Sequence, residues 1–176
     1  MRRRGSLEKL TADAVWGDQN AQLRLGVCYS EGKGVAQDQR HGWGWLLVAA
    51  RQGNAEAQFR LGLYREEHAV RQSYPYLVAE AAKWYEKAAE QGHAQAQNNL
   101  GMCHVRGRGM RQDYGTAFKW LGEAAAQGHD EAKRNIFNLA RQCTTLPKYL
   151  QKQVFAALTR PKARREARYE KRAEAL

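Results

Sequence analysis

The chain repeats itself, and this internal repeat constrains the fold more than any other feature of the sequence. The pattern A-A-x-Q-G occurs three times, each time with a tryptophan eight residues before its glycine. An alanine stands four residues after each of these glycines, and an earlier glycine is also followed by an alanine four residues later. The four marker glycines are Gly17, Gly53, Gly92 and Gly128, spaced 36, 39 and 36 residues apart. A regular period of this length predicts one structural unit per repeat, stacked on its neighbours.

Each unit is predicted to contain two helices. A Leu-Gly pair follows each of the first three marker glycines, with the leucine eight residues on: Leu25-Gly26, Leu61-Gly62 and Leu100-Gly101. Residues 94–106 and 114–127 carry apolar side chains at helical spacing, which indicates a first and a second helix. The glycines of the Leu-Gly pairs would lie inside first helices, where glycine costs about 1 kcal/mol relative to alanine. We expect a close approach of two helices to compensate for this cost.

The ends of the predicted helices are marked as well. The last three marker glycines stand where a helix often ends in the left-handed conformation. Asp38 and Asp113 stand where a second helix begins, so either can cap it. The second unit departs from the pattern, because 22 residues separate Gly62 from Trp84, against 19 between the corresponding residues of the other two units. Its connection also lacks the G-x-G turn of the others.

The Leu-Gly pair, the G-x-G turn, the capping aspartate, the tryptophan and the A-A-x-Q-G ending together resemble the Sel1-like repeat family, which is related to the tetratricopeptide repeats. The resemblance covers roughly residues 8–142. It implies an all-α fold, a right-handed α/α superhelix (solenoid) of helix-turn-helix Sel1-like repeats with helical caps. It also implies a role in assembling other proteins, and it supplies no catalytic residues.

Four segments are expected along the chain. Residues 1–17 are predicted to form an N-terminal capping helix, and residues 18–142 an array of about three full repeats with a partial fourth. Residues 143–160 are predicted to form a C-terminal capping helix, because their apolar residues have helical spacing and a solenoid must be closed at its end. Residues 161–176 form a basic charged tail.

The resemblance to tetratricopeptide geometry implies that the first helices line a concave groove. Alignment of the Leu-Gly pairs gives the positions that would face it: Asn20, Leu23, Val27, Glu56, Phe59, Leu63, Gln95, Asn98 and Met102. A mixed apolar groove of this kind suits an extended peptide or a helix of a partner protein. The competing interpretation is that these side chains only pack between neighbouring first helices. We favour a protein-binding adaptor that holds a protein or peptide partner in this groove.

Positive charge suggests a second interpretation. The formal net charge is +11, and residues 148–176 hold nine Lys or Arg residues against three Glu. The connecting loops are expected to stack along one edge and to bring four further cations together: Lys33, Arg71, Arg108 and Arg111. The tail and this basic edge either bind nucleic acid, as in a ribonucleoprotein accessory factor, or are solvated charges without function. The basic edge would also suit acidic protein segments.

The sequence does not predict an enzyme. Two S-x-x-K sequences lack the S-D-N and K-T-G elements that accompany them in penicillin-recognising enzymes. Cys103 and His104 are neighbours in a predicted helix and point in different directions, so they do not form a nucleophile and its base. His93 and His129 recur just after a marker glycine, which favours a role in the turn over metal binding. We therefore expect no catalytic residue, no metal and no cofactor.

The sequence also predicts a cytoplasmic protein. The longest apolar run, residues 45–50, is far shorter than the roughly 20 residues of a membrane-spanning helix. No apolar stretch follows the basic start of the chain, as it would in a signal peptide. The three cysteines are odd in number and far apart, which indicates reduced thiols.

Overall fold

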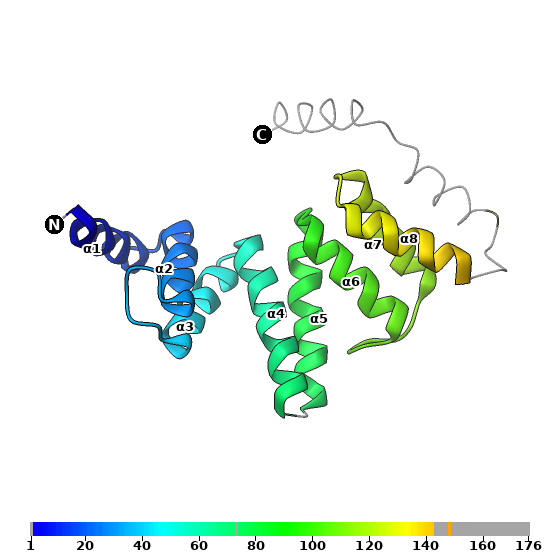
Figure 1. Cartoon of the computed structure of the whole chain (residues 1–176), viewed down its shortest axis with the longest axis horizontal. Coiled ribbons are helices and arrows are strands. Elements are labelled where there is room, and N and C mark those ends of the chain that lie inside the picture. Colours follow the sequence, from blue (N-terminus) through cyan, green and yellow to red (C-terminus); the bar gives the residue numbers. More distant parts are fainter. Residues whose placement is uncertain (1, 73, 143–147, 149–176) are drawn as a thin grey trace. The chain divides into compact units, whose positions relative to one another are not determined.

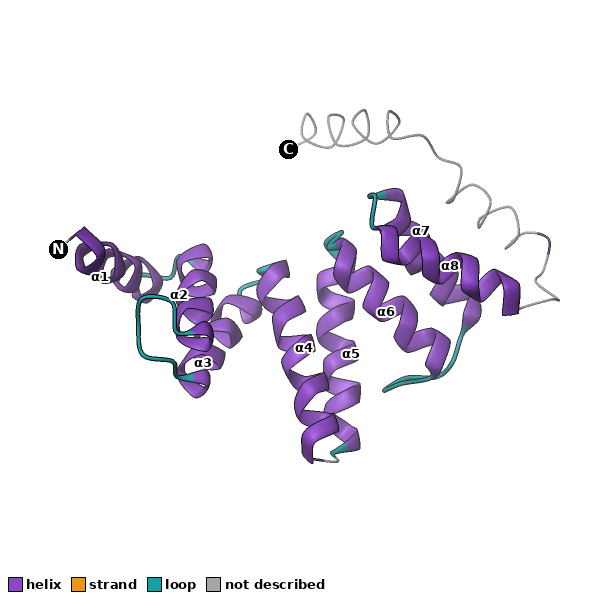
Figure 2. Ribbon diagram, viewed as in Figure 1, coloured by secondary structure: helices purple, strands orange, loops and turns teal. Residues whose placement is uncertain are grey.

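The computed structural model describes residues 2–72, 74–142 and 148. In this part of the chain eight helices follow one another as helix-turn-helix repeats (Figure 1). They are α1 (Arg2–Val15), α2 (Gln19–Glu31), α3 (Gln39–Arg51), α4 (Ala55–Gln72), α5 (Pro75–Glu90), α6 (Ala94–Arg106), α7 (Tyr114–Ala126) and α8 (Asp130–Gln142). Loops join the described helices (Figure 2). The all-α repeat fold predicted from the sequence is confirmed.

The chain divides into two compact units, which we call the N-terminal unit (Met1–Gln91) and the C-terminal unit (Gly92–Leu176). In the N-terminal unit each of the helices α1 to α5 packs against the next, so that α2 with α3 and α4 with α5 form two repeat pairs. In the C-terminal unit α6 and α7 form the third pair, and α8 packs against both of them.

Side chains just before the helices fix where the helices begin. A carboxylate oxygen of Asp38 accepts a hydrogen bond from the backbone N–H of His41 at 3.0 Å at the start of α3. Asp113 does the same for Thr116 at 3.1 Å at the start of α7. These bonds satisfy backbone donors that the first turn of a helix leaves open. The two predicted aspartate caps are confirmed.

The marker glycines end the preceding helices. All four adopt positive φ angles, between 86° and 101°, which disfavour any residue with a Cβ atom. The predicted left-handed helix ends are confirmed, and each marker glycine turns the chain from one helix into the next.

Two histidines cap the first helices of the C-terminal unit. Nδ1 of His93 accepts a hydrogen bond from the backbone N–H of Ala96 at 3.2 Å. Nδ1 of His129 accepts one from Ala132 at the same distance. The turn role predicted for both histidines therefore takes the form of helix capping.

Replacing His129 with alanine is expected to lower the free energy of unfolding by about 1 kcal/mol, because the N–H of Ala132 loses its acceptor. His129→Asn should keep the wild-type stability, since Asn54 caps α4 in this way through a 3.0 Å bond from Ala57. Urea unfolding measures both variants. Equal losses for the alanine and asparagine variants would argue against a capping role.

The glycines of the Leu-Gly pairs lie where two helices of one repeat cross. A Cβ atom at Gly26 would lie 2.8 Å from Cγ of Leu46 on α3. At Gly62 it would lie 2.4 Å from Cε1 of Tyr85 on α5, and Gly101 makes the corresponding approach to α7. The close approach expected from the sequence is confirmed, and it explains why glycine stands inside these helices.

Small and branched apolar side chains fill the space between the helices. A cluster between α1 and α2 consists of Leu10, Ala14, Ala21 and Leu25. A second cluster, between α3 and α4, consists of Leu46, Ala49, Ala50, Ala57 and Leu61. In the C-terminal unit, α7 and α8 share a cluster of Ala117, Phe118, Leu121, Ala124, Ala125, Ala132, Ile136 and Leu139. The leucines of the Leu-Gly pairs are thus core residues, and the many alanines let neighbouring helices lie close together.

The second repeat uses its extra residues to lengthen its helices. α4 has 18 residues and α5 has 16, whereas α2, α3, α6 and α7 have 13 each. Pro75 begins α5, at a position where its missing N–H costs nothing. The longer connection inferred from the sequence is therefore a longer helical hairpin.

The predicted C-terminal capping helix (143–160) and basic tail (161–176) fall almost wholly outside the described residues, which include Lys148 alone of these segments. Within the part of the chain that is described, no helix is long and apolar enough to cross a membrane.

Candidate functional site: a groove between α2 and α4

A groove of about 280 Å³ lies between α2 and α4 in the N-terminal unit. Three pairs of residues line it, and the members of each pair stand four positions apart and so share a helix face. The pairs are Leu23 with Val27, Arg24 with Cys28, and Glu56 with Arg60. The side chains that α2 contributes are mostly apolar, and those that α4 contributes are charged. The volume lies just below that of typical small-molecule sites, which span roughly 300–1,000 Å³, and suits one or two side chains of a ligand.

The apolar floor of the groove is part of the packed core. Leu23 and Val27 are half-buried and pack against the cluster between α3 and α4. Their positions are therefore fixed by the fold before any ligand arrives. A preformed site of this kind loses little conformational entropy on binding.

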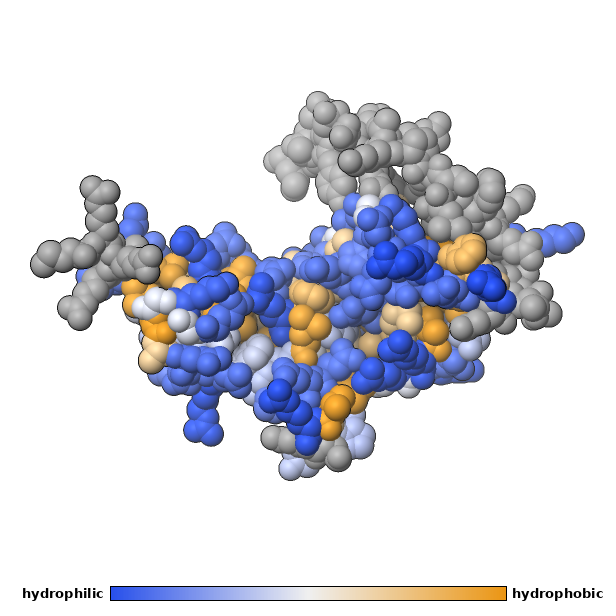
Figure 3. Space-filling view, viewed as in Figure 1, coloured by the Kyte–Doolittle hydropathy of each residue, from blue (hydrophilic) through white to orange (hydrophobic). Residues whose placement is uncertain are grey.

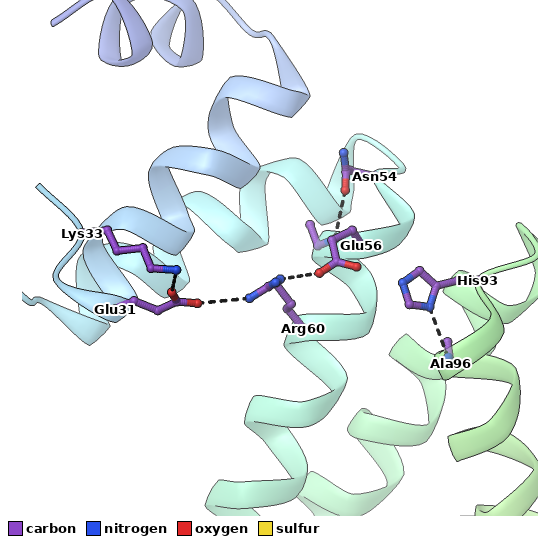
Figure 4. A network of polar contacts seen from close by, with 8 residues as sticks. Glu31, Lys33, Asn54, Glu56, Arg60, His93 and Ala96 are labelled. Atoms are coloured by element: carbon purple, nitrogen blue, oxygen red, sulfur yellow. Dashed lines mark hydrogen bonds and ion pairs between the residues drawn. The ribbon is translucent and has the colours of Figure 1, made fainter. Parts of the chain in front are cut away.

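A chain of ion pairs runs from α4 to the C-terminal end of α2 (Figure 4). Nε of Arg60 lies 2.5 Å from Oε1 of Glu56, and Nη1 of Arg60 lies 3.6 Å from Oε1 of Glu31. Lys33 pairs with the other oxygen of Glu31. The hydrogen bond that Lys33 donates, with smaller contributions from the charges of Lys33 and Arg60, holds the pKa of Glu31 below its ordinary value. Arg60 is thus held in place by two carboxylates.

Arg24 differs from the other charged residues of the groove. Its side chain is exposed on α2, and within the described part of the chain it forms no ion pair or hydrogen bond. It stands beside the apolar floor as a positive charge that no described carboxylate pairs with.

The structure brings three of the six concave residues predicted in the N-terminal unit, Leu23, Val27 and Glu56, into this one groove. The others lie differently. Asn20 is exposed and its side-chain oxygen accepts a 3.3 Å bond from Asn54, and Leu63 is 42% exposed. Phe59 is only 8% exposed, so it offers little surface to a ligand.

The other three predicted concave residues belong to the C-terminal unit. Gln95 is exposed, whereas Met102 is half-buried and packs against the cluster of α7 and α8. Asn98 is 2% exposed, and its side-chain oxygen accepts a 2.9 Å bond from Asn135 on α8. Asn98 and Met102 thus both contact other helices of the C-terminal unit.

A set of buried glutamines was missed by the sequence analysis. Nε2 of Gln58 donates to the carbonyl of Ala50 at 3.0 Å, and its Oε1 accepts from Nε2 of Gln91 at 2.7 Å. The same pairing of a first-helix glutamine with the glutamine of the A-A-x-Q-G motif joins Gln22 to Gln52 and Gln97 to Gln127. The signal was present, because a glutamine stands five residues after each of the first three marker glycines. The motif glutamine therefore serves to lock the two helices of one repeat together.

The predicted basic edge is divided between the two units. In the N-terminal unit Lys33 pairs with Glu31, and Arg71 pairs with Glu67 at 2.7 Å. In the C-terminal unit Arg111 is exposed and Arg108 is half-buried. Acidic neighbours thus offset the charges of Lys33 and Arg71.

The face of the described helices drawn in Figure 3 is mainly hydrophilic. Figure 3 shows small apolar areas among hydrophilic side chains, for example over α4. Among the described residues, no group of three or more His, Cys, Asp or Glu side chains is placed to hold a metal ion.

Comparisons with known proteins agree with the repeat architecture. The family model described as Sel1 repeat matches residues 19–54, 55–93 and 94–129. The chain is similar to a solved Sel1 repeat protein from Oxalobacter formigenes, with 34% sequence identity, a TM-score of 0.68, and coverage of 76% of this chain and 98% of that one.

A second solved structure is that of c5321, a protective antigen present in uropathogenic Escherichia coli strains that displays an SLR fold. It is 36% identical with a TM-score of 0.67, and the match covers 74% of this chain but only 27% of that longer protein. Comparison with curated proteins gives no match.

Proposed function

Because the chain belongs to the Sel1 repeat family, we propose that it is a non-catalytic adaptor that holds a peptide segment of a partner protein in the groove between α2 and α4. The family match describes a repeat scaffold, and such repeats typically mediate interactions between proteins. The observation that carries the proposal is the groove itself. It has a firm apolar floor beside charged side chains, which is the arrangement that binds apolar anchors of a peptide.

The geometry sets the size of the contact. Leu23 and Val27 are one helical turn apart on α2, so the apolar floor extends over about 6 Å. One or two apolar side chains of a peptide fill this space, and the polar groups on either side orient the peptide backbone. A short linear segment fits this site better than a whole domain surface does.

Val27→Glu is expected to abolish peptide binding, because it places a carboxylate on the apolar floor. The test is a selection from a displayed library of random 12-residue peptides on the immobilised full chain, followed by affinity measurement for the enriched sequences. The wild type should enrich peptides with apolar anchors, and the variant should bind none of them. Val48→Glu is the matched control, because Val48 is 40% exposed on α3 and lies outside the groove.

Val27 also contacts the core, so circular dichroism must show that the variant is folded. Val27→Thr, which keeps the shape of the side chain, provides a milder second variant and should weaken binding at least severalfold. Peptides that bind the wild type and both Val27 variants equally well would overturn the proposed site. A library that yields no binding peptide would overturn the proposed function.

A further inference from the structure

We infer that the segment held in this groove is acidic, with carboxylates next to an apolar anchor. The inference rests on the proposed function, since it specifies the chemistry of the ligand for the same site. It follows from how the charged residues of the groove are paired.

The carboxylates of the groove are already engaged. Glu56 holds Arg60 at 2.5 Å, and Glu31 is shared between Arg60 and Lys33. A basic ligand would have to displace one of these cations to find a carboxylate, and it would gain little net energy from the exchange.

Arg24 is the remaining charge of the groove, and no group in the described part of the chain forms an ion pair or hydrogen bond with it. Its guanidinium presents five N–H donors in a planar fork that matches both oxygens of a carboxylate. It stands one residue along α2 from Leu23, so a carboxylate near the anchor of a bound peptide would reach it. The three cations and two carboxylates around the groove leave one net positive charge, and an acidic residue of the ligand neutralises it.

Charge also decides against a segment of this chain as the occupant. Residues 148–176 carry nine Lys or Arg against three Glu. Such a segment would bring further positive charge toward Arg24. The net charge of +11 on the whole chain favours the approach of an acidic partner instead.

Three synthetic peptide mixtures test the inference on the full chain. All peptides have ten residues, with leucine or phenylalanine at a central position and Ser and Gly among the flanking residues. The acidic mixture also has Asp and Glu at the flanking positions, and the basic mixture has Lys and Arg there. The neutral mixture has Ser and Gly alone. The peptides retained by the immobilised protein are quantified by mass spectrometry. The acidic mixture should be retained at least tenfold more than the neutral one, and this preference should fall as salt rises.

Arg24→Glu should remove the preference for the acidic mixture and raise retention of the basic one. Arg51→Glu is the matched control, because Arg51 is exposed at the end of α3 and does not line the groove. The inference would be overturned if the wild type and the Arg24→Glu variant retained acidic and neutral peptides equally well, while the Val27→Glu variant retained neither. The proposed adaptor function would still hold in that case. If the wild type retained all three mixtures no better than the Val27→Glu variant does, both the inference and the proposed adaptor function would be overturned.

Discussion

Replacing Gly42 with alanine is expected to destabilise the N-terminal unit by about 3 kcal/mol, at the upper end of the usual cost of overpacking. Gly42 lies in α3 where that helix crosses α2, and an added Cβ atom would lie 2.8 Å from both the carbonyl oxygen of Gly26 and the backbone nitrogen of Ser30. Both contacts are to backbone atoms, so no side chain can turn away to relieve them. The two helices must move apart, and the contacts around the crossing are lost with them.

Gly44→Ala provides the control within the same helix. A Cβ atom at Gly44 would meet no atom within 4 Å. Alanine there should raise the free energy of unfolding by up to about 1 kcal/mol, because glycine is the poorer helix former. Urea unfolding followed by circular dichroism measures both variants. Destabilisation by both, or by neither, would show that the close crossing is not what requires glycine at position 42.

Replacing Gln58 with alanine is expected to cost about 3 kcal/mol, since it removes a buried side chain and two hydrogen bonds at once. Gln58 is 5% exposed, and its amide joins the carbonyl of Ala50 to the side chain of Gln91. The alanine variant removes the side-chain donor of that carbonyl, which keeps its bond from the backbone N–H of Gly53, and leaves a cavity between the helices. The loss is measured as a lower urea midpoint.

Gln37→Ala is the control for the buried glutamine. Gln37 also donates to a backbone carbonyl, that of Ser30 at 2.9 Å, but it is exposed and water replaces the lost bond. Its replacement should cost about 0.5 kcal/mol. If both variants lost stability equally, burial would not be the reason for the role of Gln58.

Much of the fold was predictable because each repeat carries its own markers. The helix expected over 94–106 is α6, and the helix expected over 114–127 ends one residue earlier, at Ala126. Helix caps and left-handed turns depend on neighbouring residues alone, so the sequence predicts them well. The crossing glycines were also predictable, because a glycine inside a helix needs a reason such as a close neighbour.

Alignment of the repeats could not show which concave side chains are accessible to a ligand and which are buried. Phe59 aligns with Leu23, yet Leu23 lines the groove and Phe59 is buried. The second helices differ at the crossing, where α5 carries Tyr85, and the Phe59 ring lies 6.1 Å from that ring. Arg24 was missed because the aligned rows follow a single helix face, and it stands one residue beyond them. Such differences arise from contacts between helices, which the repeat pattern does not encode.

A peptide bound in the groove between α2 and α4 would cover the thiol of Cys28, so the reactivity of Cys28 reports whether the groove is occupied. This half-exposed thiol lines the groove, whereas Cys103 is 7% exposed in the other unit and serves as an internal control. The full chain is treated with N-ethylmaleimide, with and without a peptide selected from the library, and modification of each cysteine is followed by mass spectrometry. With peptide at ten times its Kd, labelling of Cys28 should slow about tenfold while that of Cys103 stays unchanged. Unchanged labelling of Cys28 under saturating peptide would contradict binding in this groove, because the ligand would then lie elsewhere.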